Sequence, residues 1–312
     1  MNEGHPPPTG LAAALAAGRF AFTAEIAPPL SCDPDDVIAL ARPLEGLADA
    51  VNVTDGAGAR AHMGAAAAAA ILARAGIEPV QQFTCRDRNR IALQGDLLAA
   101  AALGVRNLLL LRGDDPAAGD QPDAKPVFDL DTVGLLQTAA GLRDRGELPS
   151  GRKLAGRPAF FLGVADVPID PPAGWAPHSL AAKADAGAQF VQTQFCMDAG
   201  IVRRYLARLG EHGLLARLAI LIGVAPLKSA RAARWMVKHL PGTIIPDAMI
   251  ARLEGAADPA AEGRRLCVEL MQELAEIPGV AGAHVMAPAN AEAIPLVLAE
   301  ARKLRRIGSS LP

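Results

Sequence analysis

The chain has 312 residues, and its 31 lysines and arginines nearly balance its 33 acidic residues without any block of like charge. This balance argues against nucleic acid or an anionic membrane as the main partner, so we expect a small-molecule ligand. Hydrophobic residues make up 51% of the chain and aromatic residues only 4%, which predicts a large core of Ala, Leu, Val and Ile. The length suits one (β/α)8 barrel of about 250 residues with insertions.

Residues 1–18 are predicted to form an N-terminal extension and helix, followed by a barrel catalytic domain over residues 19–308. The apolar run 11–17 has no basic flank before it, so it does not resemble a signal peptide. Charges or prolines interrupt every stretch long enough to cross a membrane. We therefore expect a soluble, cytoplasmic protein.

Eight short apolar runs, each bounded by Gly, Pro or Asp, are predicted to be strands. The stretches between them are mostly long enough for a crossover helix, which predicts parallel strands. The segment 229–277 is long for one crossover and is predicted to hold two or three helices. The eight runs are Phe20–Ile26, Asp49–Thr54, Pro79–Thr84, Asn107–Arg112, Ala159–Val164, Phe190–Gln194, Leu218–Val224 and Ala283–Met286.

An open doubly wound sheet is the alternative fold. It usually carries a glycine-rich phosphate-binding turn after the first strand. The segment Asp55–Arg60 lacks the third glycine of that motif, and no Gly-x4-Gly-Lys-Ser/Thr occurs. The predicted fold class is therefore α/β, a single-domain (β/α)8 TIM barrel with extra helices between strands 7 and 8.

Polar residues gather near the C-terminal ends of the predicted strands, where barrel enzymes place their catalytic groups. A polar side chain inside a buried strand costs about 1–3 kcal/mol unless it is paired, so a shared ligand is the preferred explanation. These residues are Glu25, Asn52, Thr54, Asp55, Gln82, Thr84, Arg112, Asp114, Asp166, Gln192, Thr193 and Gln194.

Structural roles are the competing interpretation for several of them. One interpretation of Glu25 is an ion pair with Arg112, and the other is a catalytic role. Asn52 is better explained by pairing with a neighbouring strand. Gln192 and Gln194 share a face, and a polar layer filling the barrel is a less common alternative to a ligand.

The histidines at 62, 178, 212, 239 and 284 are interpreted as surface or cap residues. Cys85 and Cys196 are interpreted as packing residues, because no base is visibly placed beside either. The four scattered cysteines form no Cys-x-x-Cys pair, and neither a disulfide framework nor a metal site is predicted.

Three motifs in order resemble the methylenetetrahydrofolate reductase family. They are Phe22-Thr-Ala-Glu25-Ile-Ala-Pro28-Pro29, Leu111-Arg-Gly-Asp114, and the stretch from Lys183 to Phe195 that contains Thr193-Gln194. The resemblance runs from about residue 20 to residue 304. It implies an FAD-containing barrel that reduces 5,10-methylenetetrahydrofolate to 5-methyltetrahydrofolate with NADH or NADPH, in one-carbon metabolism and methionine biosynthesis.

The resemblance also assigns roles to residues. Glu25 matches the acid that helps open the methylene bridge, Asp114 the aspartate that contacts the pterin near the flavin, and Gln194 the glutamine that contacts folate and nicotinamide in turn. These three are the expected catalytic and substrate-binding residues. The expected flavin contacts are Thr54, Gln82, Leu111, Arg112, Gly113, Asp114 and Lys183.

The chain departs from the family around the flavin. Gln82 stands where a histidine is common, an aromatic that stacks on the flavin is missing near Leu162, and Asn290 falls on or beside a folate-binding arginine. Two alternatives therefore stay open. One is a flavin-free folate reductase, and the other is a folate-binding subunit of a methyl-transfer or electron-transfer complex, served by an electron-donor partner protein. A homo-oligomer is expected in either case.

Overall fold

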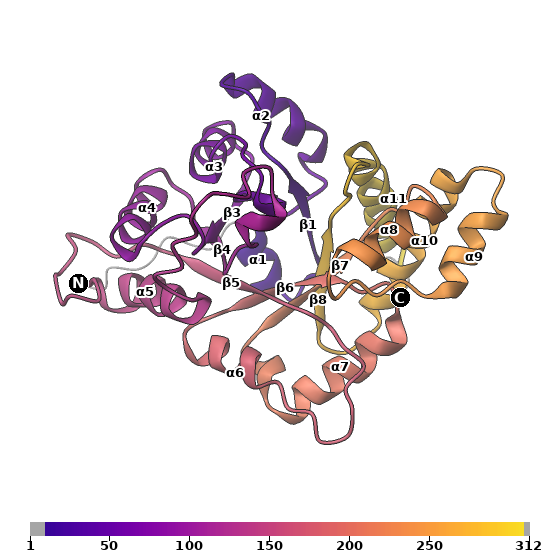
Figure 1. Ribbon diagram of the computed structural model, residues 1–312. Helices are drawn as coiled ribbons and strands as arrows, with labels where there is room; N and C mark the ends of the chain where they lie inside the picture. The colour runs from indigo at the N-terminus through magenta and orange to yellow at the C-terminus, as the bar shows by residue number, and fades with distance from the viewer. Residues whose placement is uncertain (1–9, 309–312) are drawn as a thin grey trace.

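Eight parallel strands close into a barrel in the computed structural model, which describes residues 10–308. Figure 1 shows the helices arranged around this barrel. Each strand pairs with its neighbour in chain order, and β1 pairs with β8. The strands are β1 (Ala21–Ile26), β2 (Ala50–Val53), β3 (Pro79–Thr84), β4 (Asn107–Leu111), β5 (Phe161–Asp166), β6 (Phe190–Phe195), β7 (Ala219–Val224) and β8 (Val280–Val285). The predicted TIM barrel is confirmed.

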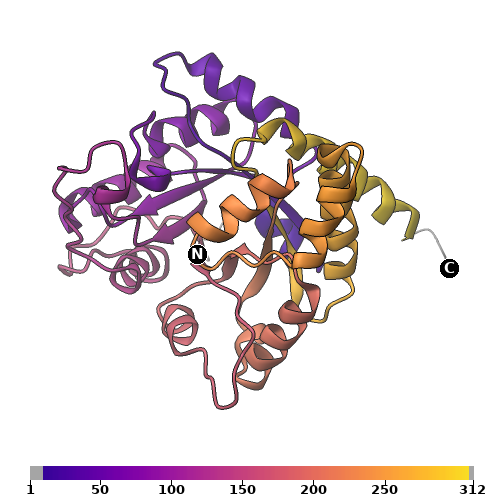
Figure 2. The same cartoon turned by 45° about the vertical axis from the view of Figure 1, so that its right-hand side comes forward.

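The helices follow the strands in the order that the crossover rule requires. They are α1 (Gly10–Ala16), α2 (Pro34–Ala41), α3 (Ala65–Arg74), α4 (Arg90–Ala102), α5 (Thr132–Arg145), α6 (His178–Asp185), α7 (Ala199–Glu211), α8 (Ala230–His239), α9 (Asp247–Gly255), α10 (Pro259–Ala275) and α11 (Ile294–Gly308). Three of them, α8 to α10, lie between β7 and β8 as predicted. Figures 1 and 2 show them grouped with α11 on one side of the barrel.

Local capping signals explain several helix boundaries. Asp33 caps α2 by accepting a hydrogen bond from the Asp35 amide, and Pro34 takes the first helical position. Helix α4 begins at Arg90. Asn89 caps that helix by accepting from the amides of Ile91 and Ala92, and an asparagine at this position is itself a sequence signal for a helix start.

Two separate sets of apolar residues form the core. The larger one packs the outer face of the strands against the helices. The smaller one fills the lower barrel interior and includes Ala21, Val80, Leu109, Phe190 and Leu221, with Leu11 and Ala14 of α1. Helix α1 therefore closes the N-terminal end of the barrel, and the interior is left open to ligands at the opposite end.

No helix within residues 10–308 is long and apolar enough to cross a membrane.

Candidate active site

Glu25 lies on the barrel-facing side of β1, one residue before the strand ends. Its Oε2 accepts a hydrogen bond of 2.8 Å from Gln82 Nε2 on β3 and lies 3.7 Å from Nε2 of His284 on β8. The Glu25 side chain keeps 24% of its surface exposed, so it is held by the barrel but still faces the open mouth.

The suggested ion pair between Glu25 and Arg112 is wrong. The Arg112 guanidinium instead lies 4.3 Å from the centre of the Phe128 ring, in a cation–π contact. Arg112 directly follows β4, and Phe128 lies in the loop that precedes α5. The basic group beside Glu25 is therefore the His284 imidazole, which is charged only when protonated.

A layer of hydrogen-bonded polar side chains fills the barrel below Glu25. The Asn52 and Gln192 amides pair across the barrel, at 2.5 Å for Asn52 Nδ2 to Gln192 Oε1 and 2.9 Å for Gln192 Nε2 to Asn52 Oδ1. Gln192 also donates to Thr23 Oγ1 at 3.0 Å, and that hydroxyl lies 2.9 Å from His284 Nδ1. All four side chains are buried, so the layer forms a satisfied polar floor to the site.

This layer corrects three interpretations. Asn52 pairs across the barrel with β6 and not with a neighbouring strand. Gln192 belongs to the barrel-filling layer that the sequence treated as uncommon. His284, interpreted as a surface or cap residue, is only 2% exposed. Strict alternation along β8 would have placed His284 on the barrel-facing side, because residues two apart share a face.

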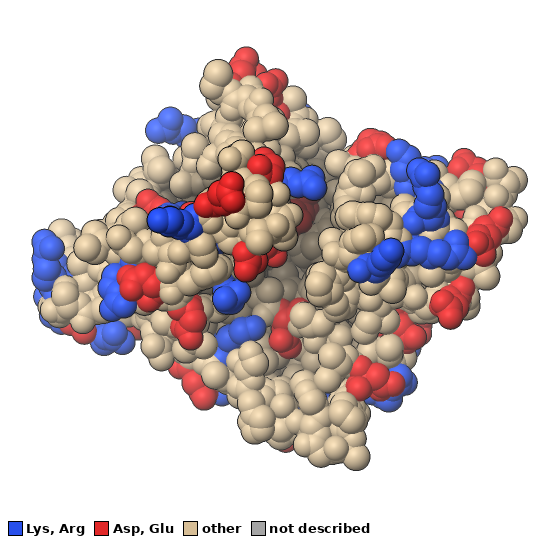
Figure 3. Space-filling view, viewed as in Figure 1, with Lys and Arg blue, Asp and Glu red and all other residues tan. Residues whose placement is uncertain are grey.

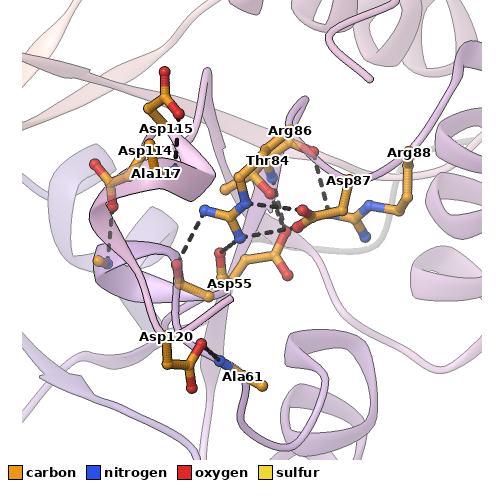
Figure 4. A network of polar contacts seen from close by, with 12 residues as sticks. Asp55, Ala61, Thr84, Arg86, Asp87, Arg88, Asp114, Asp115, Ala117 and Asp120 are labelled. Atoms are coloured by element: carbon orange, nitrogen blue, oxygen red, sulfur yellow. Dashed lines mark hydrogen bonds and ion pairs between the residues drawn. The ribbon is translucent and has the colours of Figure 1, made fainter. Parts of the chain in front are cut away.

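Asp114 lies at the exposed tip of β4 and binds the neighbouring loop. Its Oδ2 accepts from the Gly58 amide at 2.8 Å, and Asp120 accepts from the Ala61 amide at 3.3 Å. Figure 4 shows both carboxylates pointing to the segment that follows β2. The loops after β2 and β4 are thereby joined.

The loop after β3 completes this network around Asp55. The Asp55 carboxylate accepts from the amide and hydroxyl of Thr84 at 2.8 and 2.9 Å and forms an ion pair with Arg88. Arg86 donates to the Gly56 carbonyl oxygen at 3.1 Å. A cavity of about 270 Å3 lies between these loops. No specific role for Asp55 follows from the sequence, because only the fold brings these three loops together.

A larger cavity, of about 480 Å3, lies at the other end of the barrel, between α4 and the segment 154–160. None of the predicted site residues lines it. We therefore place the candidate site at the open mouth, where Figure 3 shows acidic and basic side chains around a central hollow.

Gln194 is the last barrel-facing residue of β6, and its amide is bonded to backbone on both sides. Nε2 donates to the Pro241 carbonyl oxygen at 3.3 Å, and Oε1 accepts from the Phe195 amide at 3.0 Å. A carboxamide has two N–H groups and two acceptor positions on oxygen. Among the described residues 10–308 the Gln194 amide makes these two bonds, which leave one donor and one acceptor for a ligand.

The residues expected to contact a flavin follow an arc of adjoining strands from β2 to α6. Thr54 is buried, and its hydroxyl lies 3.3 Å from His62 Nε2. Gly113 has φ +90°, and a Cβ there would lie 2.9 Å from the Thr84 Cβ, so the β4 tip needs glycine. Lys183 donates to the Ala165 carbonyl oxygen at 2.7 Å.

The β5 side of this arc carries no aromatic ring. Leu162 is fully buried in the layer between strands and helices, so a ring at that position would not reach the mouth. The barrel-facing residues of β5 are Gly163 and Ala165, by alternation from Phe161, which packs in the interior core. The Phe190 ring fills the space beside Gly163, since a Cβ at Gly163 would lie 2.2 Å from the Phe190 Cζ. The barrel-facing side of β5 beyond Phe161 therefore offers no ring that could stack on a flat ligand in the mouth.

Two further rim residues have roles within the protein. Tyr205 is buried in α7 and donates its hydroxyl to Asp166 at the end of β5. Burial, followed by the Asp166 charge, raises the pKa of Tyr205. Asn290 is 7% exposed and donates to the Pro226 carbonyl oxygen at 2.8 Å, so it does not face the mouth as a ligand-binding arginine would.

Cys85 and Cys196 are fully buried, and burial raises the pKa of each thiol to about 11. A thiol with such a pKa stays neutral near pH 7 and is a poor nucleophile, which fits packing roles. Within residues 10–308, no three His, Cys, Asp or Glu side chains gather to hold a metal ion.

Comparison with known proteins gives one family. The family model described as methylenetetrahydrofolate reductase matches residues 11–302.

Two curated relatives carry the same name. A probable methylenetetrahydrofolate reductase (NADPH) of Caenorhabditis elegans is 26% identical over 215 residues, which cover 66% of this chain and 30% of the relative. The 5,10-methylenetetrahydrofolate reductase of Salmonella typhimurium is 29% identical over 197 residues, 62% of this chain and 58% of the relative. The match thus spans less than two thirds of either relative's length.

Among solved structures, an uncharacterised protein from Clostridium thermocellum that binds two copies of 5-methyl-5,6,7,8-tetrahydrofolic acid is similar in fold. The TM-score is 0.65 at 14% sequence identity, and the match covers 95% of this chain and 99% of that one. At this identity the likeness concerns the fold alone.

Proposed function

The chain belongs to the methylenetetrahydrofolate reductase family, and from that premise we propose that it is an oxidoreductase that converts 5,10-methylenetetrahydrofolate to 5-methyltetrahydrofolate. The observation that carries the proposal is Glu25, a carboxyl group held at the open end of the barrel by Gln82 and His284. The resemblance of the first motif to the family assigns the family's acid to this position of the first strand.

The geometry around Glu25 suits proton delivery. Gln82 and His284 both approach Oε2, so Oε1 is the oxygen left to carry a proton toward the substrate. Transfer of that proton to N10 of the folate breaks the bond from the methylene carbon to N10, and the bonding electron pair goes to N10. The product is a 5-iminium cation, which a hydride then reduces to the 5-methyl group. Removal of a positioned general acid typically costs about 10²–10⁴-fold in rate.

Asp114 and Gln194 complete the proposed site. The fixed negative charge of Asp114 would stabilise the iminium cation, and the free donor and acceptor of Gln194 would bind the amide-like edge of the pterin or of nicotinamide. Asp114 now bonds to the Gly58 amide, a contact that leaves its second carboxylate oxygen for the ligand.

An FAD molecule would be held by Thr54, Gln82, Leu111, Arg112, Gly113, Asp114 and Lys183, the arc described above. Bound there, it would accept a hydride from NADH or NADPH and donate one to the folate. Cytoplasmic location, a homo-oligomer, an electron-donating partner protein and a place in methionine biosynthesis stay predictions.

The two half-reactions test this proposal separately. Glu25→Gln keeps the size of the side chain but has no transferable carboxyl proton. We expect folate reduction to fall by about 10²–10⁴-fold, while reduction of the bound flavin by NAD(P)H changes little. Stopped-flow absorbance of the purified protein measures both. Glu45→Gln, at an exposed position after α2, is the matched control.

Three outcomes would change the assignment. Equal loss of both half-reactions would contradict the role of Glu25 as the folate acid. An active but colourless protein would favour direct hydride transfer from nicotinamide. Activity only after a partner protein is added would favour the folate-binding subunit.

A further inference from the structure

The β6–β7 ladder contains an irregularity beside Gln194. Gln192 is paired with Leu221 and Phe195 with Gly223. Two residues of β6, Thr193 and Gln194, therefore lie opposite the single residue Ile222. Such a bulge adds a residue to one strand, and bulges often re-aim a side chain next to an active site.

Thr193 replaces the backbone contacts that the bulge disrupts. Its hydroxyl accepts from the Gly223 amide at 2.9 Å and donates to the Gln194 carbonyl oxygen at 2.9 Å. Thr193 is 1% exposed, so both of these bonds lie inside the protein. The hydroxyl thus fixes the backbone on both sides of the extra residue.

Gly223 supplies the space that the bulge needs. A Cβ at this position would lie 2.3 Å from the Thr193 carbonyl oxygen and 2.7 Å from that of Gln194. Both contacts are with backbone atoms, which cannot rotate away as a side chain can. A residue larger than glycine would therefore push the bulge out of place.

The strand end beyond the bulge is also fixed. The Cys196 amide donates to the Gly223 carbonyl oxygen at 2.9 Å, and the Ile244 amide donates to that of Phe195 at 2.9 Å. The segment that contains Ile244 also contains Pro241, whose carbonyl oxygen holds the Gln194 amide. The Gln194 side chain is thus bonded to Pro241 and Phe195, and the backbone on both sides of it is fixed by Thr193 and by the bonds of Phe195 and Cys196.

We propose that Thr193 and Gly223 are positioning residues for Gln194. The bulge that they form directs the Gln194 carboxamide, so that its one free N–H and one free acceptor face the ligand in the barrel mouth. This inference rests on the proposed function, in which Gln194 binds folate and nicotinamide. Neither Thr193 nor Gly223 touches the ligand.

A mutant cycle tests the inference with 5,10-methylenetetrahydrofolate as the substrate. Thr193→Val keeps the shape and removes the hydroxyl, and we expect kcat/KM to fall by about 100-fold, the effect of a misplacement of about 1 Å. Thr193→Ser should restore most of the loss. In a Gln194→Ala background the Thr193→Val change should cost almost nothing, because a residue that acts only through Gln194 loses its effect with it.

Thr138→Val is the matched control, since Thr138 is also buried and its hydroxyl donates to the Gly134 carbonyl oxygen of its own helix. If Thr193→Val does not fold, Thr193→Cys takes its place, because a thiol is a weaker acceptor of similar size. Gly223→Ala should lower kcat/KM in the same way.

The outcomes separate the two proposals. A wild-type protein that reduces no folate with any donor contradicts the proposed function. An active wild type in which Thr193→Val, or Thr193→Cys in its place, behaves like Thr138→Val contradicts the positioning role alone. So does a loss of equal size in the Gln194→Ala background, since the effect would then not pass through Gln194.

Discussion

At the scale of single residues, the polar floor of the barrel is the feature that the sequence predicted least well. Asn52 and Gln192 are 140 positions apart, yet each satisfies the amide of the other. A buried amide without a partner costs about 1–3 kcal/mol, so each residue is tolerated only because the other is present. Pairs of this kind are visible only when opposite strands of the barrel are known.

This pairing predicts a non-additive response to mutation. Gln192→Leu should lower the free energy of unfolding by about 1–3 kcal/mol, because Asn52 loses its partner in a buried place. The double variant Asn52→Leu/Gln192→Leu should be more stable than the sum of the two single changes implies. Urea unfolding of the wild type, the two single variants and the double variant measures the coupling energy between the two side chains. Strictly additive losses of stability would contradict a direct interaction between Asn52 and Gln192.

At the scale of elements, close backbone contacts decide where the helices sit. Gly263 lies within α10, and a Cβ there would be 1.6 Å from the Leu227 carbonyl oxygen in the β7–α8 connection. This contact lets α10 lie directly against the loop above β7. Gly95 of α4 has the opposite environment, because a Cβ at that position would meet no atom within 4 Å.

These two helical glycines should respond to alanine in opposite directions. Gly263→Ala forces a backbone shift and should destabilise the protein by about 1–3 kcal/mol or more. Gly95→Ala removes the flexibility of an exposed helical glycine and should stabilise it by about 0.5–1 kcal/mol. Thermal unfolding monitored by circular dichroism compares the stabilities of the two variants with that of the wild type. A shift of the same sign in both variants would show that α10 does not pack as described.

The sequence predicted the bounds of some strands better than those of others. The strand Pro79–Thr84 has the bounds that the sequence predicts, since Pro79 at its start and the charged segment after it are strong boundaries. β8 begins at Val280, three residues before the predicted start. The small residues Ala281 and Gly282 form no apolar run there, but the barrel supplies partners on both sides, so the strand forms anyway.

At the scale of the whole molecule, α1 is part of the barrel core. Leu11 and Ala14 have no exposed surface and pack with residues from several strands at the closed end. The two ends of the barrel thus differ, with an apolar plug at one and a polar mouth at the other. The predicted site residues lie around the mouth, so we expect the proposed chemistry there.

The plug predicts a large effect from a single substitution. Leu11→Ala should lower the free energy of unfolding by about 2–5 kcal/mol, as for other buried leucines. Leu30→Ala, at a side chain that is 85% exposed, is the control and should change little. Chemical denaturation of both variants makes the comparison, and equal small effects would mean that α1 does not contribute to the core.

The sequence by itself determined the order of strands and helices, the barrel class and the family, because these depend on local apolar periodicity and on motifs such as Leu111-Arg-Gly-Asp114. Only the tertiary structure decided which polar residues meet. It paired Glu25 with Gln82 and His284, joined Asp114 to the loop after β2, and turned Arg112 toward Phe128. The reason is physical: periodicity reports which face a residue occupies, but a hydrogen bond needs two groups within about 3 Å, and closure of the barrel alone brings distant strands that close.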